Sequence, residues 1–505
     1  FGIINLVWNY PIDKIDLSHV QNIVKYADQL NIFGLDKANW TALVANLVGE
    51  KLGMNVAVDA TMFAHVDWAK ENQTVVDLIG KAQEILDVNK FESTIEISKF
   101  FNDAAYLSNQ YVTEENFELI AEALEITAEL DVLEVLLPGL AEFGMNKLGT
   151  GVTGDFTTIT SSEFTTLAYM IREALEFGAV EMYNNILWGE KYFYEGEFDL
   201  SHVINIVKAL EELNILAVDK PHLAQFIASK LNLATNVDFA VYEAIDYSAE
   251  NAKVVEIIEL VDELMQNTYL TNLEFIYHWI DEEGFKSAQY ITDENALVVA
   301  DIIEAVSELQ LLAPYGKELS NKAFNKIAAL NYLVDAYEGE QLVEDLANVA
   351  TIVRDLVEFD VIDLFYWQTT EEFKFDALRE AIDLALNLNI LNVKRPETMA
   401  LVLNKVLPAL GVNASYSAAD FANVDFATDD ATILAAYDQL VMLFKEMNID
   451  GTAMLDEYIN GRLFMLPQYT NEITIEYAVE FVDLIADLDQ LEIVIDELAL
   501  VVLNR

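Results

Sequence analysis

Hydrophobic residues along the chain recur at the spacing of one face of an α-helix. Val20, Ile23, Val24, Ala27 and Leu30 lie at positions i, i+3, i+4, i+7 and i+10. The spacing predicts a helix that ends near Leu30. Similar patterns predict helices from Phe117 to Ala128, near Trp40 to Leu52, and from Asp67 to about Leu86.

Start signals support these helices. Thr113 is followed by two acids, and so is Thr292. A threonine hydroxyl can accept an N–H group at the start of a helix, and acids in the first turn interact favourably with the helix dipole. The segment from Gly149 to Ser162 is rich in Gly, Thr and Ser, which predicts a loop with at most a short extended segment. The expected fold class is therefore mainly all-α.

Three short sequence markers recur along the chain at one constant interval. This interval is the number of residues from position 67 to position 246, and again from 246 to 425. We call it the marker interval. The markers are Asp67-Trp68-Ala69 with Asp246-Tyr247-Ser248 and Asp425-Phe426-Ala427; Tyr111-Val112-Thr113 with Tyr290-Ile291-Thr292 and Tyr469-Thr470; and Leu130-Asp131 with Leu309-Gln310 and Leu488-Asp489. Agreement of three separate markers predicts an internal repeat. We place the copies at 1–180, 181–359 and 360–505, and the last copy is truncated.

Each copy is expected to divide into two related halves. The helix ending at Leu30 resembles the one ending at Leu130, and an aromatic-rich stretch precedes each. The result would be tandem modules of about 80–100 residues with three helices each, five complete and one truncated. Such modules are expected to stack into a rod-like or superhelical array.

The charge of the chain is strongly one-sided. Against 86 Asp and Glu stand 28 Lys and Arg, which gives a net charge of −58. Binding to nucleic acid requires clusters of Lys and Arg, so nucleic acid is a poor partner. A basic protein or peptide, or divalent cations such as calcium, would match this charge.

The absence of cysteine excludes disulfides and thiolate chemistry, and it is compatible with the exterior of many bacteria. No apolar run approaches the length of a membrane span, since even the stretch 132–140 contains Glu134 and Pro138. Because the chain begins at Phe1 rather than Met, we expect it to come from a longer protein.

Candidate chemistry is sparse. The nucleophile elbow, the phosphate-binding glycine loop and the zinc-binding His-Glu-x-x-His helix are all missing from the sequence. His19 and His202 occupy equivalent places, but Ala377 stands there in the third copy, which disfavours a repeated catalytic role. We therefore expect a non-enzymatic protein without a resident cofactor.

Carboxylates lie four residues apart on one helical face in all three copies. The pairs are Asp67 with Glu71, Asp246 with Glu250, and Asp425 with Asp429. In one interpretation the first acid caps the helix and the second interacts with its dipole. In the other, the pairs are calcium sites completed by loop oxygens, although they lack the spacing of a dedicated calcium loop.

An aromatic residue follows the first acid of each pair, at Trp68, Tyr247 and Phe426. The type of aromatic residue changes while the aromatic character is kept, which is typical of a packing position. We therefore predict that the three residues are buried in equivalent places.

The stretch from Val66 to Asn72, with the apolar run 75–79 after it, resembles the helical repeats of very large acidic surface proteins of low-GC bacteria, Bacillota and Mollicutes among them. The resemblance implies an extracellular or cell-surface protein of many modules that builds a filament, a coat or an adhesive stalk, with self-association or neighbouring repeats as partners. It transfers no functional residues. The alternative from the residues is an acidic helical-repeat scaffold that binds a basic protein or peptide.

Overall fold

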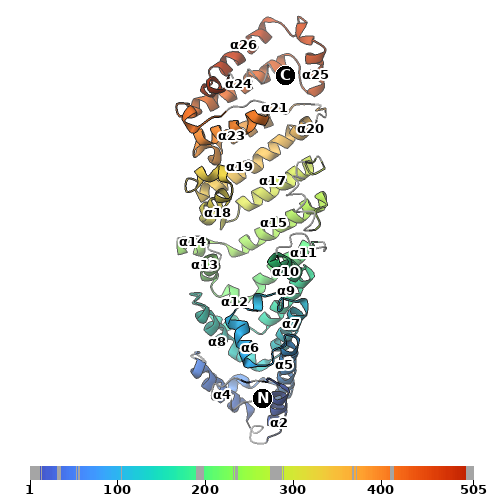
Figure 1. Cartoon of the computed structure of the whole chain (residues 1–505), viewed down its shortest axis with the longest axis vertical. Coiled ribbons are helices and arrows are strands. Elements are labelled where there is room, and N and C mark those ends of the chain that lie inside the picture. Colours follow the sequence, from blue (N-terminus) through green and yellow to red (C-terminus); the bar gives the residue numbers. More distant parts are fainter. Residues whose placement is uncertain are drawn as a thin grey trace. The chain divides into compact units, whose positions relative to one another are not determined.

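The structure is a computed structural model of the chain (Figure 1). It describes residues 12, 14–30, 36–52, 54, 57–103, 105–188, 198–230, 233, 237–272, 287, 289–366, 369–370, 372–409 and 415–495. All regular elements within these ranges are helices, and none of the described residues lies in a β-strand. The expected all-α fold is therefore confirmed.

The chain forms two compact units. Unit 1 comprises Phe1–Asn232, Asp238–Asp262 and Leu270–Glu282, and unit 2 comprises Leu233–Val237, Glu263–Tyr269 and Glu283–Arg505. The helix α15 (Tyr247–Thr268) begins in unit 1 and ends in unit 2. The predicted copies at 1–180, 181–359 and 360–505 were defined by recurring sequence, whereas the two units are defined by compact packing. The copy boundaries therefore stay a prediction.

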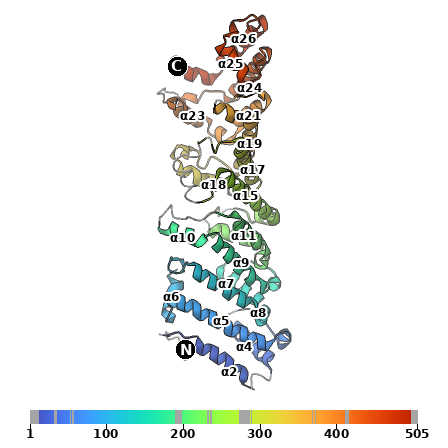
Figure 2. The same ribbon diagram turned by 90° about the vertical axis from the view of Figure 1, so that its right-hand side faces the viewer.

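In unit 1 a row of helices packs side by side in sequence order. The row consists of α2 (Ser18–Gln29), α5 (Trp68–Val88), α7 (Glu114–Ala128), α9 (Ser162–Glu176) and α11 (Leu200–Glu212). Figure 2 shows α2, α5, α7 and α9 as successive inclined ribbons. Their bounds confirm the helices predicted from the periodicity in this part of the chain.

A second group of helices in unit 1 is joined by short 3-10 turns. The group contains α4 (Lys37–Leu52), η1 (Ala60–Phe63), α8 (Asp131–Leu148), η3 (Phe156–Thr158), α12 (Asn214–Ala217), α13 (Lys220–Lys230) and α14 (Phe239–Ala244). Phe63 of η1 packs with Ala42 of α4 and with Val132 of α8. Phe156 of η3 likewise belongs to one buried cluster with Leu137 of α8 and Leu223 of α13. The buried turns therefore join one helix of this group to the next.

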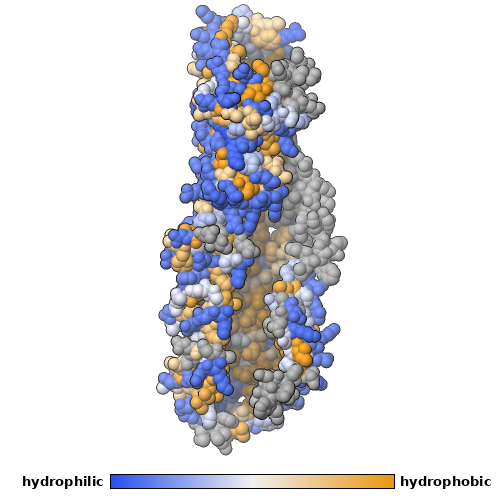
Figure 3. Space-filling view, turned by 60° about the vertical axis from the view of Figure 1, so that its left-hand side comes forward, coloured by the Kyte–Doolittle hydropathy of each residue, from blue (hydrophilic) through white to orange (hydrophobic). Residues whose placement is uncertain are grey.

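Three further short elements lie among the described residues of unit 1: α6 (Thr94–Asn102), η2 (Ala105–Leu107) and α10 (Ala179–Trp188). The predicted loop at 149–162 is confirmed apart from the turn η3 within it. Gly149 ends α8 with a φ of 69°, a left-handed conformation that glycine adopts without steric cost. Figure 3 shows that the surface of unit 1 is hollowed on one side, with hydrophobic residues on the floor of the hollow.

Unit 2 also contains a row of helices. Its row consists of α17 (Asp293–Ser307), α19 (Gly339–Glu358), α21 (Phe375–Asn387), α24 (Phe426–Glu446) and α26 (Glu472–Ala486). The other elements of unit 2 that the structure describes are α18 (Leu312–Lys326), η5 (Ala328–Leu333), α20 (Val361–Phe365), α22 (Asn389–Asn392), α23 (Arg395–Ala409), η6 (Ala418–Phe421), α25 (Thr452–Asn460) and η7 (Leu463–Met465). A last helical segment occupies 489–495.

The predicted helix starts are confirmed and have a common internal support. Thr113 and Thr292 each accept the N–H group three residues further on, at 3.2 Å. That third residue is a buried asparagine, Asn116 or Asn295, which donates its amide to the carbonyl oxygen five residues earlier at 2.9 or 3.0 Å. In unit 2, Thr474 donates its hydroxyl to the equivalent carbonyl at 2.9 Å. These partly buried bonds fix the chain as it enters α7, α17 and α26.

Within the described ranges, no helix combines the length and the apolar character needed to cross a bilayer.

Candidate functional site

The first acid of each predicted carboxylate pair caps its own helix. Asp67 Oδ1 accepts the N–H groups of Ala69 and Lys70 at 3.1 and 3.3 Å. Asp246 accepts two N–H groups at the start of α15, and Asp425 accepts one at the start of α24. The capping interpretation of these three acids is therefore confirmed.

The second acid of the pair reaches a different helix from the one that carries it. Glu71, only 5% exposed, accepts the N–H groups of Asp131 and Val132 at the start of α8, at 2.9 and 3.2 Å. Asp429, only 1% exposed, accepts the N–H groups 60 and 61 residues further on, at 3.0 and 2.9 Å. Glu250 is buried at the equivalent position. From the sequence, the second acid of each pair was expected to interact with the dipole of its own helix. The structure shows that Glu71 and Asp429 also hydrogen-bond the start of a later helix.

Two acids that the sequence analysis missed have the same arrangement. Glu163 accepts the N–H groups of Asn214 and Ile215 at the start of α12, at 2.9 and 3.3 Å. Asp345 accepts two N–H groups at the start of α22, at 2.7 Å each. Both acids are buried. We call Glu71, Glu163, Asp345 and Asp429 the junction carboxylates.

A signal for the missed acids was present in the sequence. With Glu250 included, the five buried acids follow one another at nearly regular intervals, each within the first two turns of a long helix. Unequal loop lengths make these intervals differ slightly, and a search at the constant marker interval therefore does not detect them.

The junction carboxylates are electrostatically suited to helix starts. A carboxylate that accepts two N–H groups there makes two charge-assisted hydrogen bonds and interacts favourably with the positive end of the dipole. At Glu71 burial raises the pKa above its ordinary value, while the bonds from Val132 and Asp131 act in the opposite direction.

The same geometry bears on calcium. Among the described residues, no group of three or more His, Asp or Glu is arranged to hold a metal ion. A cation at Asp67 and Glu71, or at the equivalent pairs, would compete with the N–H groups that these oxygens already accept. Calcium binding therefore stays a prediction.

The aromatic residues Trp68, Tyr247 and Phe426 are half-buried rather than buried, so that prediction was wrong in degree. Each lies at the first position of its helix, where one side faces solvent. Full burial belongs to the aromatic residues five positions earlier, which are 0 to 1% exposed: Phe63, Tyr242 and Phe421. They lie in or beside short helical turns, and the marker interval separates each from the next.

The histidines considered for catalysis have ordinary partners. His202 Nδ1 lies 2.8 Å from Glu173 Oε2, which also accepts the amide of Asn205 at 3.0 Å. His19 is exposed and 4.0 Å from Asp16. These contacts join neighbouring helices or one helix turn, and they place no nucleophile beside a histidine.

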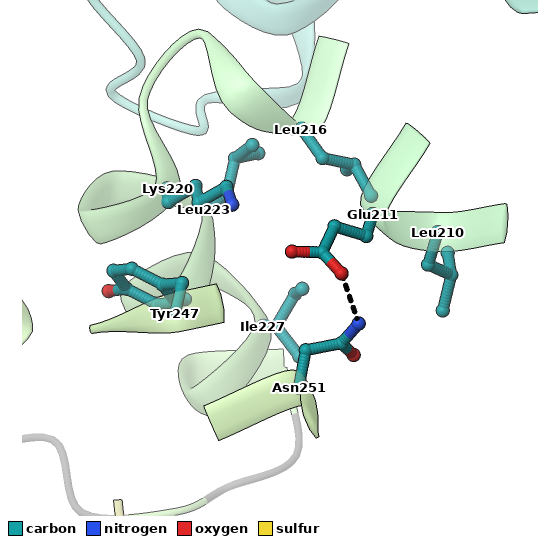
Figure 4. A pocket seen from close by; sticks show the side chains of 9 residues that line it. Leu210, Glu211, Leu216, Lys220, Leu223, Ile227, Tyr247 and Asn251 are labelled. Atoms are coloured by element: carbon teal, nitrogen blue, oxygen red, sulfur yellow. Dashed lines mark hydrogen bonds between the residues drawn. The ribbon is translucent and has the colours of Figure 1, made fainter. Parts of the chain in front are cut away.

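An apolar pocket of about 200 Å³ opens in unit 1 between α11, α12, α13 and α15 (Figure 4). Apolar side chains make up most of its wall: Leu210, Leu216, Leu223, Ala224, Ile227 and the ring of Tyr247. Burial raises the pKa of Tyr247 to about 12. Its hydroxyl donates to the carbonyl of Tyr242 at 2.9 Å, which fixes the ring in the pocket wall.

Two charged groups stand at the edge of this pocket. The Glu211 carboxylate accepts the amide of Asn251 at 3.0 Å and the hydroxyl of Ser248 at 2.9 Å, and these two bonds lower its pKa. In Figure 4 this carboxylate points toward the middle of the lining side chains. The ammonium of Lys220 lies 6.0 Å from the Tyr247 ring centre and forms no ion pair with a described acid.

Unit 2 has a counterpart pocket of about 680 Å³ between α21, α23 and α24. Phe426 and Asp430 line it, one marker interval after Tyr247 and Asn251. Here the cation is Arg395, whose guanidinium lies 4.7 Å from the Phe426 ring centre and donates to Asp430 at 2.5 Å. Arg395 and Asp430 therefore satisfy each other, while Lys394 and Glu397 also line this pocket.

Comparisons with protein-family models, with curated proteins and with solved structures found no significant match for this chain.

Proposed function

We propose that the chain is a non-enzymatic structural protein, an array of tandem helical modules. The observation that carries this proposal is the set of junction carboxylates. Each one hydrogen-bonds the start of a helix that lies 44 to 61 residues further on, and so ties one segment to the following one. Contacts made only between neighbouring segments are typical of repeat proteins.

The proposed module contains three long helices and short connecting turns. The stretch from α7 to α10 is an example, with two row helices, α7 and α9, one helix of the second group, α8, and the turn η3. The nearly regular intervals between the buried acids support modules of the expected length, two to each copy. A rod-like or superhelical array would result if successive modules stack in the same way.

For the whole protein we propose an extracellular or cell-surface filament, coat or adhesive stalk. Support comes from the absence of cysteine and from the resemblance of the residues around Asp67 to the repeats of large bacterial surface proteins. The net charge of −58 keeps the outer surface solvated and opposes unspecific lateral association.

Imaging tests this proposal. Gold-labelled antibodies against the chain should decorate the surface of intact cells of the source organism, and negative-stain electron microscopy of the purified chain should show an elongated particle. Label confined to the interior of opened cells would contradict the surface location. A compact, round particle would contradict the array.

A second candidate function is a scaffold that binds a basic protein or peptide. It is favoured by the pockets beside Tyr247 and Phe426, which are separated by the marker interval. An array can carry such sites at its period without any change to its helical framework.

A further inference from the structure

We propose that the pocket of unit 1 binds a cationic amphipathic peptide segment of a partner protein, with an apolar side chain of the peptide in the pocket and its Arg or Lys against Glu211. This inference rests on the second candidate function, the binding scaffold, and it does not depend on where the array is located.

The apolar part of the pocket suits one large side chain. The lining is almost entirely hydrocarbon, and two of its residues expose much of their surface, Leu210 at 37% and Ile227 at 52%. Covering them would remove apolar surface from water, which is favourable in proportion to the area covered. A leucine or phenylalanine side chain has a volume that the pocket of about 200 Å³ can hold.

The charged edge selects a cation. Glu211 is held by Asn251 and Ser248, so its carboxylate is already oriented, and its lowered pKa keeps it ionised. An oriented carboxylate loses little freedom on binding a guanidinium or ammonium group, and such charge-assisted bonds are among the strong ones. Lys220 lies at the same edge, where its ammonium can donate to a carbonyl oxygen of the bound peptide.

The whole chain favours the same partner chemistry. Its 86 acidic residues against 28 basic ones attract a cationic peptide from a distance and repel an acidic one. A peptide with apolar and basic residues on one helical face fits both the apolar pocket and this charge.

The pocket of unit 2 provides an internal reference. One cation and one acid of its lining, Arg395 and Asp430, are bonded to each other, and their side chains are only 12% and 22% exposed. A ligand that used Asp430 would have to break this pair. Tighter binding of the peptide is therefore expected at the unit 1 pocket, in a ratio of one peptide to one chain at that site.

The test is a fluorescence anisotropy titration of the full chain with a dye-labelled peptide of leucine and arginine at helical spacing. We expect saturable one-to-one binding that Glu211→Gln weakens roughly tenfold, the effect of one charge-assisted hydrogen bond. Ile227→Ser should also weaken binding. Because the pKa of Glu211 is lowered from 4.5, binding should be constant from neutral pH to about 5 and decline only at lower pH.

The matched control is Glu212→Gln, which removes the same charge from the next residue of α11, an exposed acid outside the pocket. This variant should change the dissociation constant of the peptide by no more than about twofold, the change expected from loss of long-range attraction alone. Equal losses of affinity in Glu211→Gln and Glu212→Gln would overturn the proposal. So would a failure of the leucine–arginine peptide to bind, or tighter binding of a leucine–glutamate peptide. Since elongation of the particle is measured separately, failure of this test leaves the array proposal standing.

Discussion

The pockets beside Tyr247 and Phe426 share a framework and differ in where the acid lies. In unit 1 the acid is Glu211 on α11, across the pocket from an amide on α15. Glu211 lies three residues before the start of α12, and in unit 2 the residue three before the start of α22 is Leu386. The acid there is Asp430 on α24, which is bonded to Arg395. Moving one carboxylate from one helix to another converts an open charged edge into a closed ion pair.

This difference indicates that two regions with similar buried residues can differ in their surface chemistry. The fully buried residues behind both pockets, Tyr242 and Phe421, are aromatic at equivalent positions. Stability then depends on what the two regions share, and binding depends on where they differ.

The largest effect is expected for the shared aromatic core. Tyr242→Ala and Phe421→Ala should each lower the free energy of unfolding of their own unit by about 3–5 kcal/mol, because each leaves a large cavity. Chemical denaturation of the full chain, followed by near-ultraviolet circular dichroism, measures both. If one substitution cost less than about 1 kcal/mol, the two positions would not be equivalent.

Removal of a junction carboxylate should have the next largest effect. Glu163→Ala and Asp429→Ala each leave two N–H groups without their acceptor, at a cost of about 2–3 kcal/mol. Hydrogen exchange should accelerate at the start of α12 in the first variant and just after α26 in the second. Glu212→Ala, an exposed acid, serves as the control and should change stability by no more than about 0.5 kcal/mol. Unchanged exchange at both helix starts would argue against these junctions.

A smaller effect should distinguish the two cations. Arg395→Ala breaks a mostly buried ion pair and a stacking contact, and should cost about 1–3 kcal/mol, between the values for exposed and for fully buried pairs. Lys220→Ala breaks no ion pair with a described acid and should cost no more than about 0.5 kcal/mol. Thermal melts of the two variants give the comparison. Equal losses would mean that Lys220 is as fully engaged as Arg395.

The smallest effect is expected for calcium. If Asp67 and Glu71 bind it, the melting temperature should rise more in calcium than in sodium at equal ionic strength, and Asp67→Asn with Glu71→Gln should remove the excess from unit 1. Competition from the N–H groups already bound makes any excess small. Superimposable melts in the two salts would leave only general screening by cations.

The sequence predicted the helices well because their signal is local. Apolar spacing and the capping threonines depend on residues within a few turns of each other, and α2, α5 and α7 lie close to their predicted ranges. The marker interval likewise located equivalent helix starts, since α5, α15 and α24 begin at Trp68, Tyr247 and Phe426.

The sequence did not predict what depends on packing between distant segments. Phe63 lies in a four-residue turn, too short to show a hydrophobic period, whereas Trp68 opens a long amphipathic helix and was favoured for that reason. That Glu71 would face the start of α8 could not be inferred from a chain in which acids are abundant. The pocket edge formed by Glu211 and Lys220 was missed for the same reason.

The direction of the junction carboxylates bears on how the chain is made. In all four cases the acid precedes the helix start that it binds, by 60, 51, 44 and 60 residues for the first bond of each. During synthesis from the N-terminus, each acid therefore leaves the ribosome before its partner exists. Folding of one segment is completed only when part of the next has emerged. The growing chain is expected to fold as a zipper that follows translation, with a single unfinished end at any moment.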